Sequence, residues 1–357
     1  MKRYLNAFFI FIFISGFAFA NAESSSEHQK TAEPTLKESI KHQIKHHLLD
    51  SYDFHVFSDN SENKHYSFPL PVILWDNGLV IFSSSKLHHG ESVVEAKGNY
   101  YKVYHNQIYK TDATGAINTD EHGHALNEKP LDFSITKSVF SVLLVAVLMF
   151  FLFRTMAKNY AQTPVPKGVA KFLEPLVVFV RDEIAIPNIG KKYYERYMGY
   201  LLTVFFFIWI INLTGLTPLG INVTGNIAVT FALALMTFLI TQFTAKADYW
   251  KHIFWMPGVP VFMKIVLAPI ELLGVIIKPF ALMIRLYANI SAGHIVLMSL
   301  IGLLFVFNNW FARGAFLGLT LFLSIIELLV AFLQAYIFTM LTALYFGFAV
   351  AEHEEHH

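Results

Sequence analysis

PIELLGVIIKPFALMIRLYANISAGHIVLMSL, residues 269–300, is apolar enough to lie in a bilayer, yet it carries an arginine at position 285. A charge near the centre of a bilayer costs roughly 2.5–3.5 kcal/mol on insertion scales, so such a residue indicates function. Arginine is the most informative case because its guanidinium stays protonated at any relevant pH. The alternative is that Lys278 and Arg285 extend to the headgroup region, which the apolar residues on both sides of Arg285 disfavour.

On an ideal helix of about 100° per residue, four polar residues of this stretch fall within roughly 40° of one line. They are Glu271, Lys278, Arg285 and Asn289. One polar stripe on an otherwise apolar helix is what a proton or ion path requires. His294 falls on the other side of the helix, although a bend at Gly293 could move it, and Pro279 could kink the helix between Glu271 and Arg285.

The last third of the chain contains two long apolar helical segments, about residues 259–307 and 313–348. The first is far longer than one membrane span requires, so it must bend, tilt steeply or break. Its candidate break points are Pro260, Pro269 and Pro279. In the second segment, Glu327, Gln334 and Tyr345 lie within about 20° of one line, which predicts a second polar stripe.

The composition indicates an integral membrane protein. The 357 residues are 55% hydrophobic, and the mean hydropathy is +0.46. A formal net charge of +1, without a basic patch that contains aromatic residues, argues against a nucleic-acid partner. The chain has no cysteine, which excludes disulfides, thiolate metal sites and cysteine catalysis.

Residues 1–22 have the pattern of a secretory signal peptide. Lys2 and Arg3 precede a short apolar run, and Ala20-Asn21-Ala22 forms a cleavage site. The alternative, an uncleaved membrane helix, is disfavoured because the apolar run is short for a span. Cleavage would start the mature chain near Glu23, on the outer face of the membrane.

Residues 23–133 are polar and predict a small exported α+β domain. A capping box at 35–38 predicts a helix to about residue 49. Short β segments are expected at 52–57, 66–75, 79–83, 92–96 and 100–109. Asp76-Asn77-Gly78 is a strong hairpin signal between two of them.

Most of the sixteen histidines fall in this exported domain, including His42, His46, His47, His88, His89, His122 and His124. His42 and His46 are one helical turn apart, a spacing that can chelate a metal ion or sense pH. Glu38 and Asp50 could add a carboxylate. The alternative, an ordinary solvated surface, is favoured because polar residues at such spacings are common on exposed helices.

Residues 134–357 predict an all-α polytopic membrane domain. Its spans are expected at 139–153 with flanking residues, at about 200–216 and 227–243, and in the two long C-terminal helices, which gives about four to five crossings. A basic connection between the first two spans indicates the cytoplasmic side. It contains Arg154, Lys158, Lys167, Lys171, Lys191, Lys192 and Arg196. Within it, residues 169–180 could form an amphipathic helix on the membrane surface.

The two polar stripes carry motifs of a known family. IRLYANISAGH at 284–294, followed by LQAYIFTMLTALY at 333–345, resembles subunit a of the F-type rotary ATP synthase. That family shows R-L-x-x-N-x-x-A-G-[EH] and then L-Q-A-[FY]-[IV]-F-x-x-L, and INLTGLTP at 211–218 also fits. The resemblance covers about residues 135–352, which leaves the exported domain as a lineage-specific extension.

The resemblance implies a role for each matching residue. Arg285 matches the essential arginine that faces the carboxylates of the rotating c-ring. Asn289, His294, Glu327 and Gln334 match the outer access path, and Glu271 matches an acid of the inner path. The chain departs from the family at Gly274 and Ala281, where relatives carry small hydroxyl residues. It also departs at Asn226, which stands roughly where relatives have an acid.

The resemblance further implies a stator with two half-channels, and a subunit that is not an enzyme on its own. Its partners would be the c-ring, the peripheral-stalk b subunits and the bilayer, and its ion would be H⁺, with Na⁺ left open. No cofactor or metal is expected. The location implied is the bacterial inner membrane, with a periplasmic mature N-terminus and a cytoplasmic C-terminus.

Three other classes are alternatives to this interpretation. A secondary transporter or channel would also carry an intramembrane charged stripe, but the sequence shows no internal repeat of broken helices. An intramembrane protease would use Ser291 and His294, which lie three residues apart on one helix without a supporting acid motif. A membrane-anchored sensor would explain the exported domain but not Arg285.

Overall fold

The structure, a computed structural model, describes residues 50–59, 64–90, 92–121, 123–162, 168–217, 221–256, 259–307 and 309–351. All the described residues belong to one compact unit. The expected signal peptide at 1–22, the expected helix at 35–49 and its histidines lie outside the described residues, and so does His122.

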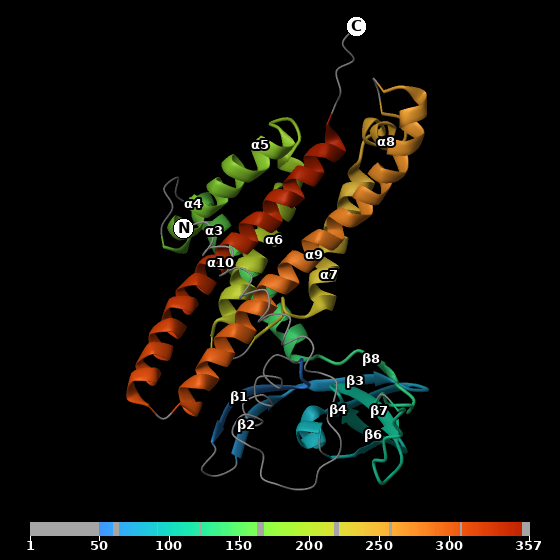
Figure 1. Cartoon of the computed structure of the whole chain (residues 1–357), viewed down its shortest axis with the longest axis vertical. Helices are drawn as coiled ribbons and strands as arrows, with labels where there is room; N and C mark the ends of the chain where they lie inside the picture. The colour runs from blue at the N-terminus through green and yellow to red at the C-terminus, as the bar shows by residue number, and fades with distance from the viewer. Residues whose placement is uncertain are drawn as a thin grey trace, which may run out of the picture. The chain divides into compact units, whose positions relative to one another are not determined.

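Five helices of the described part are long and apolar enough to cross a membrane (Figure 1). They are α3 (Lys137–Gln162), α6 (Tyr194–Gly215), α7 (Ile227–Thr244), α9 (Val261–Val306) and α10 (Trp310–Val350). Together with the small strand-rich region that precedes them, they confirm the expected fold class: a mostly helical, polytopic chain with long C-terminal helices.

Shorter helical segments connect these spans. They are α4 (Val169–Phe179), the π-helical turn η2 (Val180–Ala185), α5 (Ile186–Ile189) and α8 (Ala247–Phe254). The amphipathic pattern at 169–180 therefore forms a helix, which buries Ala170 and Leu173. The sequence did not predict α8, whose eight residues carry Asp248 in the first turn and Lys251 in the last, as the helix dipole favours.

Helix α9 is not broken at its prolines. Pro260 is the N-cap residue, and Pro269 and Pro279 lie inside the helix. Prolines of membrane helices are tolerated where neighbouring groups satisfy the freed backbone carbonyls. At 1.5 Å per residue, 46 residues extend roughly 69 Å, so the helix must tilt steeply to fit a bilayer core of about 30 Å. Helices α9 and α10 lie side by side (Figure 1).

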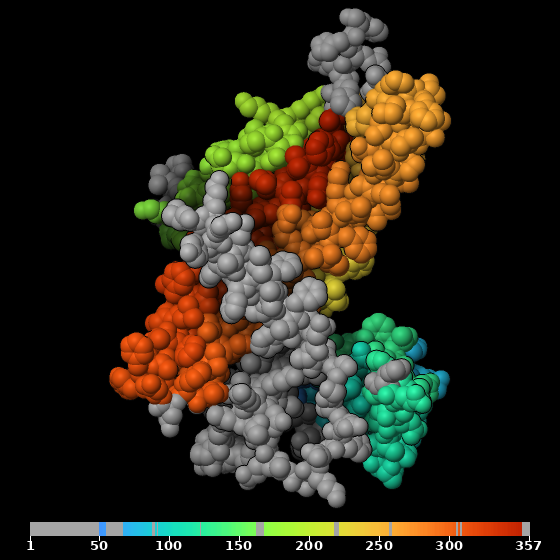
Figure 2. Space-filling model, viewed as in Figure 1, coloured from blue at the N-terminus to red at the C-terminus, as the bar shows by residue number. Residues whose placement is uncertain are grey.

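The core of the helical part is built around α6. Its Leu201, Phe205 and Ile208 are fully buried, in one apolar cluster with Phe338 and Phe346 of α10. By contrast, long stretches of α9 and α10 remain uncovered, and Figure 2 shows the first half of each on the surface of this face. We expect lipid or another chain to cover these faces, because apolar patches of this size rarely stay exposed to water.

The region before α3 is a set of small antiparallel sheets. Strand β1 (Asp53–Asp59) pairs with β2 (Lys64–Pro69). A second sheet has the strand order β4-β3-β8 and consists of β3 (Pro71–Trp75), β4 (Leu79–Ser83) and β8 (Leu131–Asp132). A third sheet has the strand order β5-β6-β7 and consists of β5 (Val94–Ala96), β6 (Asn99–Tyr104) and β7 (Gln107–Thr111). The 3₁₀ helix η1 (Ser84–Gly90) follows β4.

Two expected strands divide in the structure. The segment 66–75 splits at Leu70, whose N–H donates to Oγ of Ser84 at 2.9 Å instead of to a strand. The segment 100–109 folds back as the β6–β7 hairpin, because His105 and Asn106 both adopt a positive φ, 46° and 60°. Two successive residues with positive φ are typical of a type I′ turn, which His105 and Asn106 form here without the glycine that such turns usually contain.

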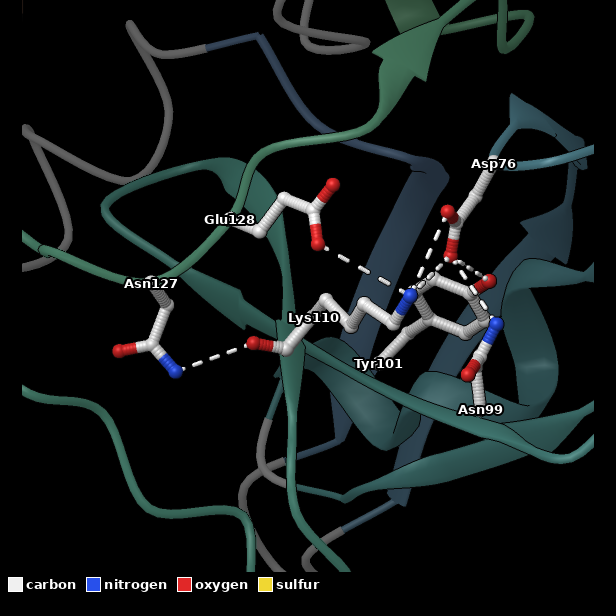
Figure 3. Close-up of polar contacts among 6 residues, drawn as sticks. All are labelled: Asp76, Asn99, Tyr101, Lys110, Asn127 and Glu128. Atoms are coloured by element: carbon white, nitrogen blue, oxygen red, sulfur yellow. Dashed lines mark hydrogen bonds and ion pairs between the residues drawn. The ribbon is translucent and has the colours of Figure 1, made fainter.

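Asp76, the first residue of the Asp-Asn-Gly turn, also makes contacts that the sequence did not predict (Figure 3). Its carboxylate accepts hydrogen bonds from Asn99 at 3.1 Å and Tyr101 at 2.9 Å, and Lys110 Nζ lies 3.0 Å away. Burial raises the pKa of this carboxyl, but the hydrogen bonds and the charge of Lys110 outweigh it, so the pKa is lowered. Asp76 thereby ties the β3–β4 hairpin to the β5-β6-β7 sheet.

Candidate functional site

Arg285 lies on the exposed side of α9. Alanines at the neighbouring helical positions, Ala281, Ala288 and Ala292, are exposed beside it. The guanidinium therefore projects from a strip of small side chains, which allows another helix to approach closely.

The residues that follow Arg285 connect α9 to α10. Asn289 Nδ2 donates a 3.0 Å hydrogen bond to Oε1 of Gln334, 45 residues later in the chain. Asn289 stands four residues, roughly 6 Å along the helix, beyond Arg285. The Gln334 side chain is buried, and its Nε2 has no protein partner in the described part of the chain. A polar pair thus lies one helical turn from the arginine.

His294 is buried against α6. Its Nδ1 lies 3.1 Å from the carbonyl oxygen of Ile290 and its Nε2 lies 3.2 Å from that of Gly215. A neutral imidazole can donate to one of these carbonyls, whereas an imidazolium donates to both. A Cβ at Gly215 would come within 3.3 Å of Nε2 and 2.9 Å of the Ile221 oxygen, so glycine is what admits the ring. Neither nitrogen is hydrogen-bonded to Ser291, and the protease alternative gains no support from this geometry.

Glu327 approaches α9 at Gly293. A Cβ on Gly293 would lie 2.5 Å from Oε1 of Glu327, so the glycine of the A-G pair lets the carboxylate reach the helix backbone. This Oε1 is buried without a protein hydrogen-bond partner among the described residues. A buried carboxylate oxygen needs a partner, and water is the partner that a polar cavity can supply.

A cavity of about 270 Å³ lies between α6, α9 and α10 and collects these groups. Its polar lining residues are Asn212, Asn289, His294 and Glu327. The other described lining residues are apolar. Several waters fit this volume at about 30 Å³ each. We call this space the outer cavity.

Asn212 was not singled out from the sequence as a site residue. Its Oδ1 accepts a 2.8 Å hydrogen bond from Oγ1 of Thr224, and its Nδ2 is buried without a protein partner in the described part. An amide inside the apolar INLTG stretch was the available signal, because a polar group in a membrane helix is costly unless it is used.

A second cavity, of about 260 Å³, lies between α8, α9 and the end of α10. Glu271 and Lys278 line it together with Tyr249 and His252 of α8. The ammonium of Lys278 lies 5.5 Å from the ring centroid of Phe348, within cation–π range. We call this space the inner cavity.

The two cavities lie on opposite sides of Arg285 along α9, and no described residue lines both. Lys278 is the inner-cavity residue nearest in sequence to Arg285, and Asn289 is the outer-cavity residue nearest to it. They are eleven residues, roughly 16 Å, apart along the helix. Between them Leu286 is completely buried, in one apolar cluster with Phe338. Of the four polar residues of the predicted stripe, Glu271 and Lys278 thus line the inner cavity, Asn289 lines the outer cavity, and Arg285 lies between them.

Asn226 lies apart from this arrangement. It is the N-cap residue of α7, and its Oδ1 accepts the Ala228 N–H at 3.0 Å. It lines a third cavity, between α7 and the N-terminal region, rather than the outer cavity. Among the residues that the structure describes, no group of three or more His, Asp or Glu side chains is placed to hold a metal ion.

Comparison with known proteins matches both parts of the chain. The family model "ATP synthase A chain" matches residues 138–347, and a domain family of unknown function matches residues 43–133. The chain is 44% identical over 237 residues to ATP synthase subunit a of Chloroherpeton thalassium, covering 63% of this chain and 69% of that protein. It is 36% identical over 318 residues to ATP synthase subunit a 2 of Prosthecochloris aestuarii, covering 85% and 97%. With subunit a 2 of Chlorobaculum tepidum it shares 44% over 265 residues, covering 72% and 73%.

Proposed function

Because this chain belongs to the ATP synthase A chain family, it is an ion-translocating stator subunit of the F-type ATP synthase, and we propose that it works through two offset half-channels. The observation that carries the proposal is the pair of cavities on either side of Arg285 that share no lining residue. A continuous pore would short-circuit the membrane, whereas two blind paths force each ion to travel on a rotating partner.

The outer half-channel uses the outer cavity. His294 and Glu327 exchange protons with water there, and the Asn289–Gln334 pair orients water at the end nearest Arg285. Glu327 Oε1 lies against Gly293, the residue before His294, and both side chains line the same cavity, so water in that cavity can pass a proton between them.

The inner half-channel uses the inner cavity. Glu271 holds a negative charge at its border and favours the approach of protons, while Lys278 marks the end nearer to Arg285. Between the two cavities, the buried side chains of Leu286 and Phe338 exclude water.

Arg285 couples the two paths electrostatically. A ring carboxylate that faces lipid keeps its proton because desolvation disfavours the charged form. When it comes opposite Arg285, the fixed positive charge favours ionisation, so the proton leaves into a half-channel. The same charge repels any proton that would pass directly between the cavities. Each charge that crosses gains about 2.3 kcal/mol per 100 mV, and this energy drives rotation.

The proposed partners are the c-ring, on the face that carries Arg285, and the peripheral-stalk b subunits. The exposed alanines beside Arg285 fit the close approach of a ring helix. The subunit itself is non-catalytic within the complex, and H⁺ is the ion proposed, with Na⁺ as the alternative to test. A general transporter or channel is set aside because the family is established.

The proposed placement is the bacterial inner membrane. Residues 1–22 are the signal peptide, 23–133 an exported periplasmic domain and 134–357 the membrane domain. The basic residues between α3 and α6 support a cytoplasmic position for that connection, which puts the start of α3 at the periplasmic side and the C-terminus in the cytoplasm.

ATP-driven proton pumping in inverted membrane vesicles tests the coupling role. With assembly of the complex confirmed, Arg285→Ala is expected to abolish pumping. Lys264→Ala on the same helix, outside both cavities, is the matched control and should pump normally. Normal pumping by an assembled Arg285→Ala complex would contradict the proposal.

A further inference from the structure

A third cavity, of about 290 Å³, lies where the N-terminal domain meets the membrane helices. Its lining comes from both parts: Asp50 and the β6–β7 turn on one side, and the loop and first turn of α7 on the other. Its polar residues include Asp50, His105, Asn106, Gln107, Asn222 and Asn226. We call this space the vestibule.

Asp50 holds the two parts of the vestibule together. Its backbone oxygen accepts a 2.7 Å hydrogen bond from Nδ2 of Asn106 in the β6–β7 turn. Its carboxylate accepts the Ser138 N–H of α3 at 3.0 Å, and Asn226 Nδ2 lies 3.5 Å away, at the limit of hydrogen bonding. One residue therefore contacts the domain, α3 and α7, which fixes the domain turn over the start of both helices.

A line of polar side chains leads from the vestibule toward the outer cavity. Asn222 lines the vestibule, and its Oδ1 is buried without a protein partner in the described part. Two residues later, the buried Thr224 donates its hydroxyl to Asn212, which lines the outer cavity. Buried polar groups without protein partners are normally satisfied by water. The Asn222–Thr224–Asn212 line is thus suited to carry water between the two spaces.

From this arrangement we infer that the N-terminal domain builds the mouth of the outer half-channel, so that protons reach the His294–Glu327 cavity through the vestibule. The inference rests on the proposed function for the existence of that half-channel. It assigns the added domain a place in the ion path itself: the side chains of the β6–β7 turn and Asp50 form the wall past which hydrated protons enter.

The domain thereby decides where protons enter. The other described residues that line the outer cavity, such as Leu216, Leu297 and Leu323, are apolar and offer no comparable polar exit. The Lys137 side chain lines the vestibule and is 7% exposed, so a charge at the start of α3 also faces this space. Water in the vestibule would solvate the Lys137 ammonium, whereas a dry contact between the domain and α3 would bury this charge at a high desolvation cost.

The chain has no native cysteine, so a cysteine introduced at the vestibule would be the only thiol of this subunit that a reagent can label. Gln107→Cys places a thiol on the domain wall and Ile227→Cys places one on the α7 wall, both at exposed positions. Spheroplasts carrying assembled complexes are treated with a bulky, membrane-impermeant methanethiosulfonate and then converted to inverted vesicles. Labelling is quantified by mass spectrometry, and ATP-driven pumping is compared with the same variant left unlabelled.

Labelling at either vestibule position is expected to lower pumping at least fivefold. Ala113→Cys, exposed on the same domain but away from the vestibule, should label equally and pump unchanged. The inference is overturned if the vestibule thiols do not react from the outer side, or if they react fully while pumping continues.

A deeper thiol separates this inference from the proposed function. Leu297→Cys lines the outer cavity and is treated with the membrane-permeant N-ethylmaleimide. If its labelling blocks pumping while vestibule labelling does not, the half-channel stands and its mouth lies elsewhere. If full labelling at Leu297→Cys also leaves pumping intact, the assignment of the outer cavity to the half-channel itself fails.

Discussion

The outer and inner cavities have nearly equal volumes, about 270 and 260 Å³, but they hold different chemistry. Among the described residues lining the outer cavity, His294 and Glu327 are the titratable groups. The inner cavity is bordered by Tyr249, His252, Glu271 and Lys278. In the proposed half-channels, a proton in the outer cavity therefore depends on two specific groups, whereas the inner cavity offers several charged or hydroxyl groups that can substitute for one another.

Backbone packing reinforces the difference. In the outer cavity, Gly215 and Gly293 bring the helices so close that a Cβ would meet His294 or Glu327. At the inner end of α9, a Cβ on Gly274 would meet nothing within 4 Å. The outer site is thus fitted around its two titratable side chains and the inner site is not, which predicts that substitutions on the outer side have larger effects.

The largest expected difference is between Glu327→Gln and Glu271→Gln. Loss of the outer carboxylate removes one of the two groups proposed to exchange protons, so pumping should fall by about a hundredfold, the lower range for a lost general acid–base group. Loss of the inner carboxylate should lower pumping by only about twofold, since single charges at partly exposed sites contribute little. Initial rates of ATP-driven pumping in inverted vesicles measure both.

ATP hydrolysis by each complex serves as the assembly control. Equal losses in the two variants would contradict the contrast between the cavities, and a larger loss for Glu271→Gln would reverse it.

A smaller effect is expected when the close approach at Gly293 is altered. In Gly293→Ala the new Cβ would stand 2.5 Å from Oε1 of Glu327, so the carboxylate must rotate away from its position. An off-rotamer side chain costs about 1 kcal/mol, which corresponds to roughly a fivefold loss of pumping. Gly274→Ala on the same helix is the matched control and should pump like the wild type. Equal rates in the two variants would show that the Glu327 position is not fixed by this glycine.

Much of this contrast was accessible from the sequence. The helical spacing of Arg285 and Asn289, and of Glu327 and Gln334, predicted two polar stripes, and the Asn289–Gln334 hydrogen bond joins them. The positions of His294 and Arg285 on different sides of one helix followed from the same 100° rotation per residue. Periodicity works here because long apolar helices leave few competing explanations for a polar residue.

Other features depend on tertiary packing that periodicity does not encode. Asn212 reaches the outer cavity because the end of α6 meets α9 where Gly215 contacts His294, a residue 79 positions later in the chain. Asn226, which stands roughly where relatives have an acid, lines the vestibule and not the outer cavity, and its place in an ion path stays a prediction. The β6–β7 turn escaped prediction because His105 and Asn106 adopt positive φ without a glycine to mark it.

The smallest effect should come from Tyr249→Phe, which tests whether the inner cavity has an essential hydroxyl. Tyr249 lies on α8, and its hydroxyl accepts a 3.4 Å hydrogen bond from Gln242. Burial raises the pKa of Tyr249 by more than the hydrogen bond from Gln242 lowers it, and the charge of Glu271 adds a smaller increase. The phenol therefore stays protonated throughout the working pH range and does not relay protons by ionising. Its removal should leave the pumping rate within about twofold of wild type between about pH 6 and 9, because the other groups at the cavity border remain. A tenfold loss, or a pumping rate that acquires a new pH dependence, would mean that the inner path also depends on specific side chains, and the two cavities would then work alike.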